Sequence, residues 1–588
     1  MEQAEQLRLE GVIESIIFHS EETGFTVMEV AVDDELVTVV GESMELSPGE
    51  EIAATGTFTA HPSYGRQFKA SCFERVMPAT AAAMLRYLSG GAVRGIGPAL
   101  AQKIVAKFGD RSLEVLENDP ARLAQIRGIS PKKAVELGEA FRRILGVRAV
   151  MEFLAARGIG AATAIAVWKK WGGLSQQTVS ADPYCLCERE IGVPFEQADE
   201  IAAGLGVEAD APCRIRGGIL YVLTHNLGNG HACLPADKLL DTACRLLQVP
   251  LEAGRRSLLE LTENGAVVID QVGGCEYVYL PEQYSAECYA ADRLALMMRF
   301  PAQEQPVSAE ELSILEEELS ISYADRQRRA IAAAVSEPMM ILTGGPGTGN
   351  GIITLFERRA MKVALAAPTG RAAKRLSEVT GREAKTIHRL LEVDFGSEAG
   401  APRFKRNERN PLPFDAVVVD EMSMVDAVLF QSLLKAVRTD SRLVLVGDPD
   451  QLPSVGAGNV LRDLIDSGAV ACIHLDEVFR QAANSLIVTS AHRIVSGQMP
   501  ELSRRDADFF FLPAPSFEQA AATVTDLCAR RLPKAYGYSP IRDIQVIAPT
   551  KQGAAGTNEL NSRLQEALNP AQSGRGEHRF GQLLLREG

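Results

Sequence analysis

The spacing of apolar residues changes several times along the chain, and each change predicts a different kind of domain. Between residues 10 and 76, apolar and polar positions alternate over five short runs that glycines separate. Alternation with period two predicts β-strands, and five short strands in succession predict a small barrel of the OB type, which we assign to residues 1–78. The predicted strands are Val12–Ile16, Phe25–Val30, Leu36–Val40, Ile52–Thr59 and Gln67–Phe73.

Barrels of this type bind single strands of nucleic acid in some proteins and dock other proteins elsewhere. Binding of single strands requires exposed aromatic rings on which bases stack. The segment has few aromatic residues, and we expect most of them in the core: Phe18, Phe25, Phe58, Tyr64 and Phe68. Both uses of the barrel stay open, and the expected burial of the rings disfavours DNA contact.

Residues 79–205 are predicted to be helical, with one short motif that recurs about every 30 residues. Arg94–Pro98, Arg127–Pro131 and Arg157–Gly160 each precede a helix with apolar periodicity. A glycine in such a hairpin supplies left-handed or close-approach backbone, and the N-terminus of the next helix can hold a phosphate. We therefore predict tandem helix-hairpin-helix motifs that grip the DNA backbone without reading sequence. At least one of the three hairpins is expected to serve packing alone.

Within these hairpins the candidate DNA contacts are Arg94, Gly97 and Lys132. Residues 206–300 predict a winged-helix-like domain, because an amphipathic helix at Ala236–Leu247 precedes two apolar runs on either side of Gly273–Gly274. The following residues 301–322 are acidic and contain two prolines. This composition predicts a linker into a new domain.

From Ala324 onward, β and α patterns alternate, which predicts a parallel sheet with a nucleotide site at the carboxyl ends of its strands. An apolar strand at Met340–Thr343 leads into a glycine loop, and backbone N–H groups of such loops face phosphates. The loop residues are Gly344, Gly345, Pro346, Gly347, Thr348, Gly349 and Asn350, followed by Gly351. A complete loop also needs a lysine for the β- and γ-phosphates and a hydroxyl for Mg²⁺. Here those two positions are Asn350 and Gly351, so the phosphate loop is incomplete.

Two later strands end in polar residues of the kind that act on a nucleotide. An apolar strand runs into Asp420 and Glu421, which would hold Mg²⁺ and activate the attacking water. The next strand leads to Gln451, at the place where helicases carry a sensor of the γ-phosphate. The order of these three elements predicts a RecA-like motor domain over residues 323–462. The family resemblance described next implies an incomplete second one over residues 463–588.

The motor motifs resemble those of the RecD-like helicases, which are superfamily-one motors that move 5′ to 3′ on DNA. The barrel and hairpins are similar to the long form of that family, which is found without RecB and RecC. The motifs that carry the resemblance are GGPGTG, Ala367–Ala373, Thr386–Leu391, Val419–Met424 and Gly447–Pro453.

The resemblance implies a role for each residue that matches a family motif. Gln327 would contact adenine, and Arg480 would act as an arginine finger on the γ-phosphate. Thr369, Arg371 and His388 would lie along the single strand. Residues 395–412 would form an inserted hairpin that splits the duplex, and residues 546–551 would enter the second motor domain.

The chain departs from the family pattern in two places. The family loop continues with Lys-Thr, whereas this chain passes directly to a helix of about ten residues. We interpret this as a deletion of about five residues that spares the fold and impairs ATP hydrolysis. The chain also stops at Gly588, within the second motor domain, which indicates a fragment or a truncated protein.

Composition narrows the remaining functions. A formal charge of −15 argues against nonspecific coating of nucleic acid, yet residues 91–148 hold eleven Lys and Arg against six Asp and Glu. Ten cysteines without a CxxC pair predict ordinary thiols rather than a zinc site. The start is unlike a signal peptide, and no run of about 18 apolar residues occurs.

We therefore expect a multidomain bacterial cytoplasmic protein that uses ATP and Mg²⁺ and acts on single-stranded DNA and on duplex DNA with a 5′ tail. Single-strand-binding or other repair proteins are its expected partners. The alternative is a DNA-binding repair scaffold with a silent motor. A nuclease or glycosylase is disfavoured, because no further cluster of catalytic acids appears in the sequence.

Overall fold

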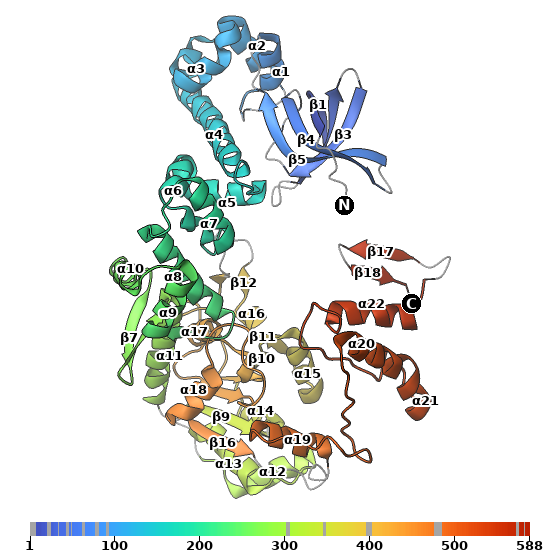
Figure 1. Ribbon diagram of the computed structural model, residues 1–588. Coiled ribbons are helices and arrows are strands. Elements are labelled where there is room, and N and C mark those ends of the chain that lie inside the picture. Colours follow the sequence, from blue (N-terminus) through green and yellow to red (C-terminus); the bar gives the residue numbers. More distant parts are fainter. Residues whose placement is uncertain are drawn as a thin grey trace. The chain divides into compact units, whose positions relative to one another are not determined.

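The computed structural model divides into two compact units, residues 1–475 and 476–588 (Figure 1), which are treated separately below. The residues that it describes are 7–19, 25–32, 35–42, 46, 48, 50–61, 65–76, 81–89, 93, 95–300, 306–344, 349–394, 403–475, 485–571, 576–580 and 583–587. Within these ranges no helix is long and apolar enough to cross a bilayer.

Five strands at the N-terminus form a closed barrel in the order β1-β2-β3-β5-β4, as the alternating pattern predicts. Ile13, Met28, Ile52 and Phe68 are almost fully buried and fill its interior. Closure pairs each strand on both sides, so the barrel has no open sheet edge to protect. The strands are β1 Leu7–His19, β2 Phe25–Val32, β3 Glu35–Glu42, β4 Glu51–His61 and β5 Gly65–Val76.

The expected burial of the barrel's aromatic residues is wrong for three of them. Phe18, Phe25 and Phe58 are 54%, 41% and 37% exposed, whereas Phe68 lies in the core. Phe18 lies near the end of β1, Phe25 begins β2, and Phe58 lies in the second half of β4. Tyr64 lies outside the described residues.

A helical region follows the barrel, and its three glycine hairpins share one backbone geometry. Gly95, Gly128 and Gly158 all have positive φ, at 94°, 104° and 74°, which glycine adopts without steric cost. The isoleucine after each glycine is buried. The helices are α1 Ala81–Ser89, α2 Pro98–Phe108, α3 Ser112–Asn118, α4 Pro131–Ala155, α5 Ala161–Trp171, α6 Ser175–Ala181 and α7 Phe195–Gly204.

The next region has the predicted winged-helix form, with helices followed by a hairpin that turns at Gly273–Gly274. A three-stranded antiparallel sheet in the order β6-β8-β7 packs against the helices. Leu239, Leu247 and Val278 lie in the core that joins this region to the preceding helices. The elements are α8 Pro212–Leu227, β6 Cys233–Pro235, α9 Ala236–Leu247, α10 Leu251–Glu263, β7 Val268–Val272, β8 Cys275–Tyr279 and α11 Pro281–Met298.

The motor domain is built on a parallel sheet of six strands in the order β11-β10-β14-β15-β9-β16, with helices on both faces (Figure 1). The strands are β9 Met339–Gly344, β10 Val363–Ala367, β11 Ala384–Thr386, β14 Ala416–Val419, β15 Arg442–Val446 and β16 Ala471–Leu475. The helices are α12 Ala309–Leu319, α13 Asp325–Ser336, α14 Gly349–Arg358, α15 Gly370–Thr380, α16 Ile387–Leu390, α17 Ala427–Ala436 and α18 Val460–Ser467.

Successive residues of each central strand point to opposite faces of this sheet, and both faces are buried. Met340 and Leu342 pack in one core with residues of α12, α13 and α14. Met339 and Ile341 pack in the other core with residues of α11, α17 and α18. The glycine loop therefore follows a buried strand, second from the edge of the sheet, that is paired on both sides.

Two predicted boundaries need correction. Residues 301–322 are not a simple linker, because they contain α12, whose Leu315 is fully buried in the motor core. A motor domain that ends at residue 462 would omit β16, which pairs in parallel with β9. The strand pairing joins Met340 to Ala471, and an ion pair joins Glu318 of α12 to Arg358 of α14. Both points depend on segments that are apart in the sequence, so local composition does not report them.

The second unit, residues 476–588, is mainly helical over its described part. Its elements are α19 Leu486–Val495, α20 Phe517–Asp526, α21 Leu532–Tyr536, α22 Thr557–Leu568 and the hairpin β17 Glu577–Phe580 with β18 Leu583–Arg586. Residues 546–551, which the resemblance places at the entry to a second motor domain, form no strand, and Ile547 is 87% exposed. A strand needs a neighbour to satisfy its backbone groups, and none lies beside this segment in the described part.

Candidate nucleotide site and DNA-contact surfaces

The nucleotide loop leaves the sheet at Gly344, where the backbone leaves no room for a side chain. Its φ of +101° is in the region that favours glycine, and a Cβ there would lie 2.2 Å from the carbonyl oxygen of Leu475 on β16. Both constraints make Gly344 a structural requirement of the loop. Gly345, Pro346, Gly347 and Thr348 lie outside the described residues.

The helix after the loop, α14, begins at Gly349 and has the ten residues that the sequence predicts. Ile352, Ile353, Leu355 and Phe356 are almost completely buried against the sheet and its neighbouring helices. A crossover helix of ten residues is therefore long enough to anchor this part of the fold. The departure from the family pattern leaves the packing of α14 intact.

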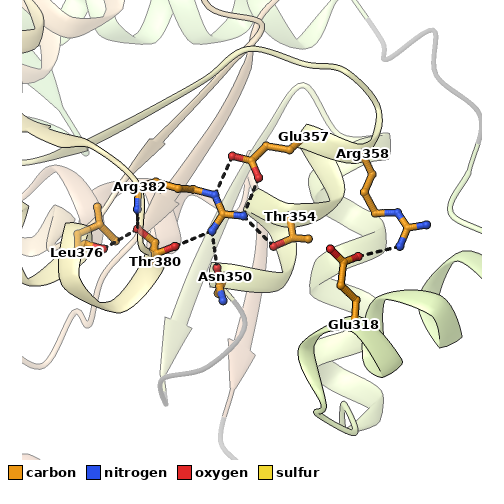
Figure 2. A network of polar contacts seen from close by, with 8 residues as sticks. All are labelled: Glu318, Asn350, Thr354, Glu357, Arg358, Leu376, Thr380 and Arg382. Atoms are coloured by element: carbon orange, nitrogen blue, oxygen red, sulfur yellow. Dashed lines mark hydrogen bonds and ion pairs between the residues drawn. The ribbon is translucent and has the colours of Figure 1, made fainter.

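Arg382, in the turn between α15 and β11, holds α14 along one side (Figure 2). Its guanidinium donates to Asn350 Oδ1 at 3.0 Å, to Thr354 Oγ1 at 3.2 Å and to both carboxylate oxygens of Glu357. It also donates to the carbonyl oxygen of Thr380 at 2.7 Å. The three α14 partners are spaced four and three residues apart, so they share one helix face.

This network determines the electrostatics of the first turn of α14. The side chain of Asn350 carries no charge, and its oxygen is already occupied by Arg382. In Figure 2 its amide nitrogen lies on the side away from Arg382. The charge of Arg382 is balanced by Glu357, and the next cation of the helix, Arg358, pairs with Glu318 at 3.0 Å. A phosphate at this turn would therefore meet no uncompensated cation from α14.

The opposite end of the candidate site carries two adjacent carboxylates where β14 ends. Asp420 Oδ1 accepts the N–H of Glu421 at 3.0 Å, and Glu421 has a left-handed φ of 55°. Burial raises the pKa of Asp420, an effect that the Glu421 N–H and Arg375 oppose. Burial and then the charge of Asp420 raise the pKa of Glu421. A non-glycine residue in this conformation is strained, and such strain concentrates at functional sites.

The residues present fit a nucleotide with Mg²⁺ only in part. Two half-buried carboxylates whose ionised forms are disfavoured are a donor set that a divalent cation would satisfy. The hydroxyl that would complete the cation site is absent at Gly351, and Asn350 lacks the lysine charge. The acidic end fits the group, and the α14 end does not.

The other predicted nucleotide residues lie at different places around the sheet. Gln451 is exposed in the turn after β15, where its backbone N–H donates to Asp448. Gln327 is in the first turn of α13, and its Oε1 accepts the backbone N–H of Ala324 at 3.0 Å. Arg480 lies outside the described residues. Contact of Gln327 with a base would require it to share or release this cap.

The residues predicted along the single strand lie on α15 and α16. Thr369 caps α15 by accepting the N–H of Ala372 at 3.2 Å, and Arg371 is exposed in the first turn of the same helix. His388 is exposed on α16, with its ring centroid 5.8 Å from that of Phe404. All three follow the carboxyl ends of β10 and β11, which are neighbours in the sheet.

Residues 393–394 and 403–404 form a short antiparallel pair, β12 with β13, at the place of the predicted inserted hairpin. Residues 395–402 lie outside the described part. The base of the pair is tied to α11, because the Tyr289 hydroxyl donates to Glu408 at 2.6 Å. Arg406 also pairs with Glu392 at 2.7 Å.

Of the three residues predicted to contact DNA in the helix-hairpin-helix region, Gly97 and Lys132 are exposed. Gly97 precedes α2, and a Cβ there would meet nothing within 4 Å, so its backbone is accessible. Lys132 is exposed in the first turn of α4, where Ser130 caps the helix by accepting the N–H of Lys133 at 3.2 Å. Arg94 lies outside the described residues.

Comparison with protein families covers both the N-terminal and the motor regions of the chain. Residues 6–78 match the model "ATP-dependent DNA helicase YrrC, OB-fold domain", and residues 143–233 match "ATP-dependent RecD2 DNA helicase HHH domain". Residues 87–143 match "SAM-like Helix-hairpin-helix tandem", and residues 327–457 match "AAA domain".

Similarity to one curated protein extends over almost the whole chain. The "ATP-dependent RecD2 DNA helicase" of Deinococcus radiodurans is 29% identical over 595 aligned residues, which cover 97% of this chain and 80% of the relative. The chain is thus similar to the RecD2-type helicases along nearly its whole length. Its family activity is that of an ATP-dependent DNA helicase, and the family uses a nucleotide and typically Mg²⁺.

Other relatives match a smaller part of this chain. The "RecBCD enzyme subunit RecD" of Mycobacterium tuberculosis is 40% identical over 217 residues, 30% of this chain and 37% of the relative. The solved structure titled "Crystal structure of Bacteroides Pif1 bound to ssDNA" is 16% identical and covers 37% of this chain and 57% of that one. Its TM-score of 0.23 is too low to support further argument.

Sequence reasoning about this RecD2-type site missed Arg382 and Arg375. Arg382 lies in a polar turn, and its spacing from α14 in the sequence gives no signal of contact. Arg375 is on α15 and acts on the carboxylates of Asp420 and Glu421 from an adjacent strand connection. The basic residues that follow Gly370 in the sequence were the available signal for Arg375.

Proposed function

We propose that this chain is a 5′ to 3′ DNA translocase and helicase whose own ATP hydrolysis is severely reduced. It acts on single-stranded DNA and on duplexes with a 5′ tail, in repair or recombination in the bacterial cytoplasm. Single-strand-binding or other repair proteins are its proposed partners. The main support is the contrast at the nucleotide site between the half-buried carboxylates of Asp420 and Glu421, the second with a left-handed φ, and the neutral, occupied first turn of α14.

In this proposal the acidic end keeps its family roles. Asp420 holds Mg²⁺, and Glu421 orients and deprotonates the attacking water when the metal nucleotide is bound. Gln451 senses the γ-phosphate, Arg480 acts as the arginine finger, and Gln327 contacts adenine. The loop residues Gly344, Gly345, Pro346, Gly347, Thr348, Gly349 and Asn350 contact the phosphates through their backbone.

The DNA contacts are assigned by the same family correspondence. Thr369, Arg371 and His388 lie along the single strand, and their positions after neighbouring strands support one shared path. Gly97, Lys132 and Arg94 contact the phosphate backbone through the hairpins. The open backbone at Gly97 supports this, because a phosphate needs close approach to N–H groups.

The size of the ATPase defect follows from the missing groups. Two unit charges about 4 Å apart interact by roughly 4 kcal/mol at an effective dielectric near 20, and Asn350 supplies no such charge. Losing one essential transition-state contact costs about 3–4 kcal/mol. We therefore expect hydrolysis at least about a thousandfold slower than in a RecD2-type relative with a complete loop.

A second candidate is a DNA-binding repair scaffold with a silent motor. The Arg382 network favours it, because this network gives Asn350, Thr354 and Glu357 a structural role that does not depend on nucleotide. The three hairpins of equal geometry would supply the DNA affinity.

Single-turnover ATPase measurements, thermal shifts with Mg-ATP and strand displacement test the proposal together. For the chain as it is, we expect a thermal shift with Mg-ATP and a very slow turnover of ATP. We expect displacement of duplexes with a 5′ tail only when a complete loop is restored. A turnover within tenfold of an intact relative contradicts the predicted defect. Absence of any nucleotide-dependent shift, with DNA binding retained, favours the scaffold.

A further inference from the structure

The N-terminal barrel exposes aromatic rings beside the two loops that bind ligands in OB folds. Phe18 and Phe25 lie on either side of the β1–β2 connection, with ring centroids 6.5 Å apart. Phe58 precedes the β4–β5 connection, and the guanidinium of Arg66, which follows it, lies 4.2 Å from the centroid of its ring. OB barrels bind oligonucleotides or oligosaccharides with these two connections and with the face of strands two and three.

The exposed rings result from the local strand geometry. The pairing of β1 with β2 shifts register between Ile16 and Phe18, which is a β-bulge. Ile17 and Phe18 are consequently both exposed, at 59% and 54%. We call Phe18, Phe25 and the adjoining Ile17 the aromatic surface of the barrel. Three large apolar side chains on one hairpin end mark an interaction site more often than an accidental exposure.

The charge of the barrel excludes the nucleic-acid ligand that the fold alone would suggest. Residues 1–78 contain fifteen acidic and four basic residues, a formal charge of −11 out of −15 for the whole chain. Strands β2 and β3, FTVMEVAV and ELVTVVGE, contain three glutamates and neither lysine nor arginine. A single strand carries a negative charge on every nucleotide, and its binding depends on cations along the groove.

The few basic residues of the barrel do not reverse this field. Arg8 pairs with Glu10 at 2.9 Å. Arg66 and Lys69 are exposed on β5, but Glu42 at the end of β3 is the strand partner of Phe25. The rings therefore lie in a negative potential, which attracts a positively charged partner.

We infer that the aromatic surface, Ile17, Phe18 and Phe25, docks a segment of a partner protein that carries lysine or arginine beside apolar side chains. The apolar side chains would pack on the two phenylalanine rings, and the basic ones would meet the surrounding carboxylates. Aromatic residues are enriched in protein interfaces, and complementary charge accelerates association. The barrel is thus a protein-docking module in a chain whose DNA contacts lie elsewhere.

The test uses the full chain and two labelled probes in fluorescence anisotropy. One probe is a short peptide that alternates lysine with leucine or tryptophan, and the other is oligothymidine. The variant Phe18→Ser with Phe25→Ser should weaken peptide binding at least about tenfold and leave oligothymidine binding unchanged. Both positions are exposed, so the barrel core is retained, and thermal melting of the variant checks this.

Two further variants separate the contribution of charge to peptide binding from nonspecific binding to exposed apolar side chains. Glu14→Lys with Glu42→Lys, the second being the strand partner of Phe25, keeps the rings and should weaken peptide binding severalfold. Leu174→Ser, an exposed apolar position outside the barrel, should leave it unchanged. A peptide with glutamate in place of lysine should not bind.

Equal peptide affinity in the ring variant and the parent chain, or no peptide binding by the parent, overturns the inference. Loss of oligothymidine affinity in the ring variant would overturn it in favour of a single-strand platform.

Discussion

The two ends of the candidate nucleotide site differ in how their polar groups are used. At the end of β14, Asp420 and Glu421 are half-buried, burial raises the pKa of both carboxyl groups, and Glu421 has a left-handed φ. At the start of α14, Asn350 and Thr354 are bonded to Arg382 in a network that serves the fold. A catalytic site keeps polar side chains in conformations that lower the stability of the fold, whereas a structural site gives its polar side chains hydrogen-bond partners.

This difference shows that the packing of α14 against the sheet needs neither a lysine nor a hydroxyl at the positions of Asn350 and Gly351. The sheet, the short helix α14 and the strained carboxylates are all in place. The missing lysine and hydroxyl leave the helix turn with neutral groups that a neighbouring arginine can bind. Each prediction below changes one end and asks whether the other end responds.

The largest expected effect comes from restoring the phosphate loop. Reinsertion of Lys-Thr and the neighbouring family residues after Gly349 should raise single-turnover ATP hydrolysis at least about a thousandfold, because it supplies the missing charge and hydroxyl. The same insertion combined with Glu421→Gln should lose this gain. If the repaired loop binds Mg-ATP and the rate stays low, the defect lies elsewhere, and the contrast between the two ends is wrong.

The next effect concerns stability at the α14 end. Arg382→Ala removes charge-assisted bonds to three α14 side chains and should lower the free energy of unfolding by about 1–2 kcal/mol, measured by urea denaturation. The matched control is Arg358→Ala on the same helix, which breaks one exposed ion pair with Glu318 and should cost less than about 0.5 kcal/mol. Equal losses in the two variants would show that Arg382 is an ordinary surface residue.

The smallest effect concerns strain at the acidic end. Glu421→Asn should raise the free energy of unfolding by about 0.5–1 kcal/mol, because asparagine tolerates the left-handed φ of 55° better than glutamate does. Glu421→Gln removes the same charge and keeps a long side chain, so it separates relief of charge from relief of backbone strain. A larger gain in the glutamine variant would mean that charge, not φ, carries the cost.

Much of the architecture was predictable because it depends on local patterns. The five barrel strands, the winged hairpin around Gly273–Gly274 and the strand that leads to Gly344 were each expected from period and turn residues. The ten-residue length of α14 was also expected. Its packing follows from the apolar residues Ile352, Ile353, Leu355 and Phe356, a run that only Thr354 interrupts.

Other features were hidden because they depend on contacts between distant segments. Residues 301–322 were taken for a linker on composition, yet Leu315 is buried against the motor. β16 belongs to the motor sheet through its pairing with β9, which no local signal reports. The exposure of Phe18 and Phe25 depends on a register shift in the barrel, and a count of aromatic residues does not contain it.

The sequence by itself determined the family, the order of domains and the absence of the loop's lysine and hydroxyl, because these depend on residue identity and spacing along the chain. Only the tertiary structure decided what the remaining groups do. It brought Arg382 to the face of α14 and placed Asp420 and Glu421 in a half-buried, strained turn. The packing of helices on the motor sheet sets the distances between these groups, and burial raises the pKa of the two carboxyl groups. Neither effect can be predicted from the residues next to them in the sequence.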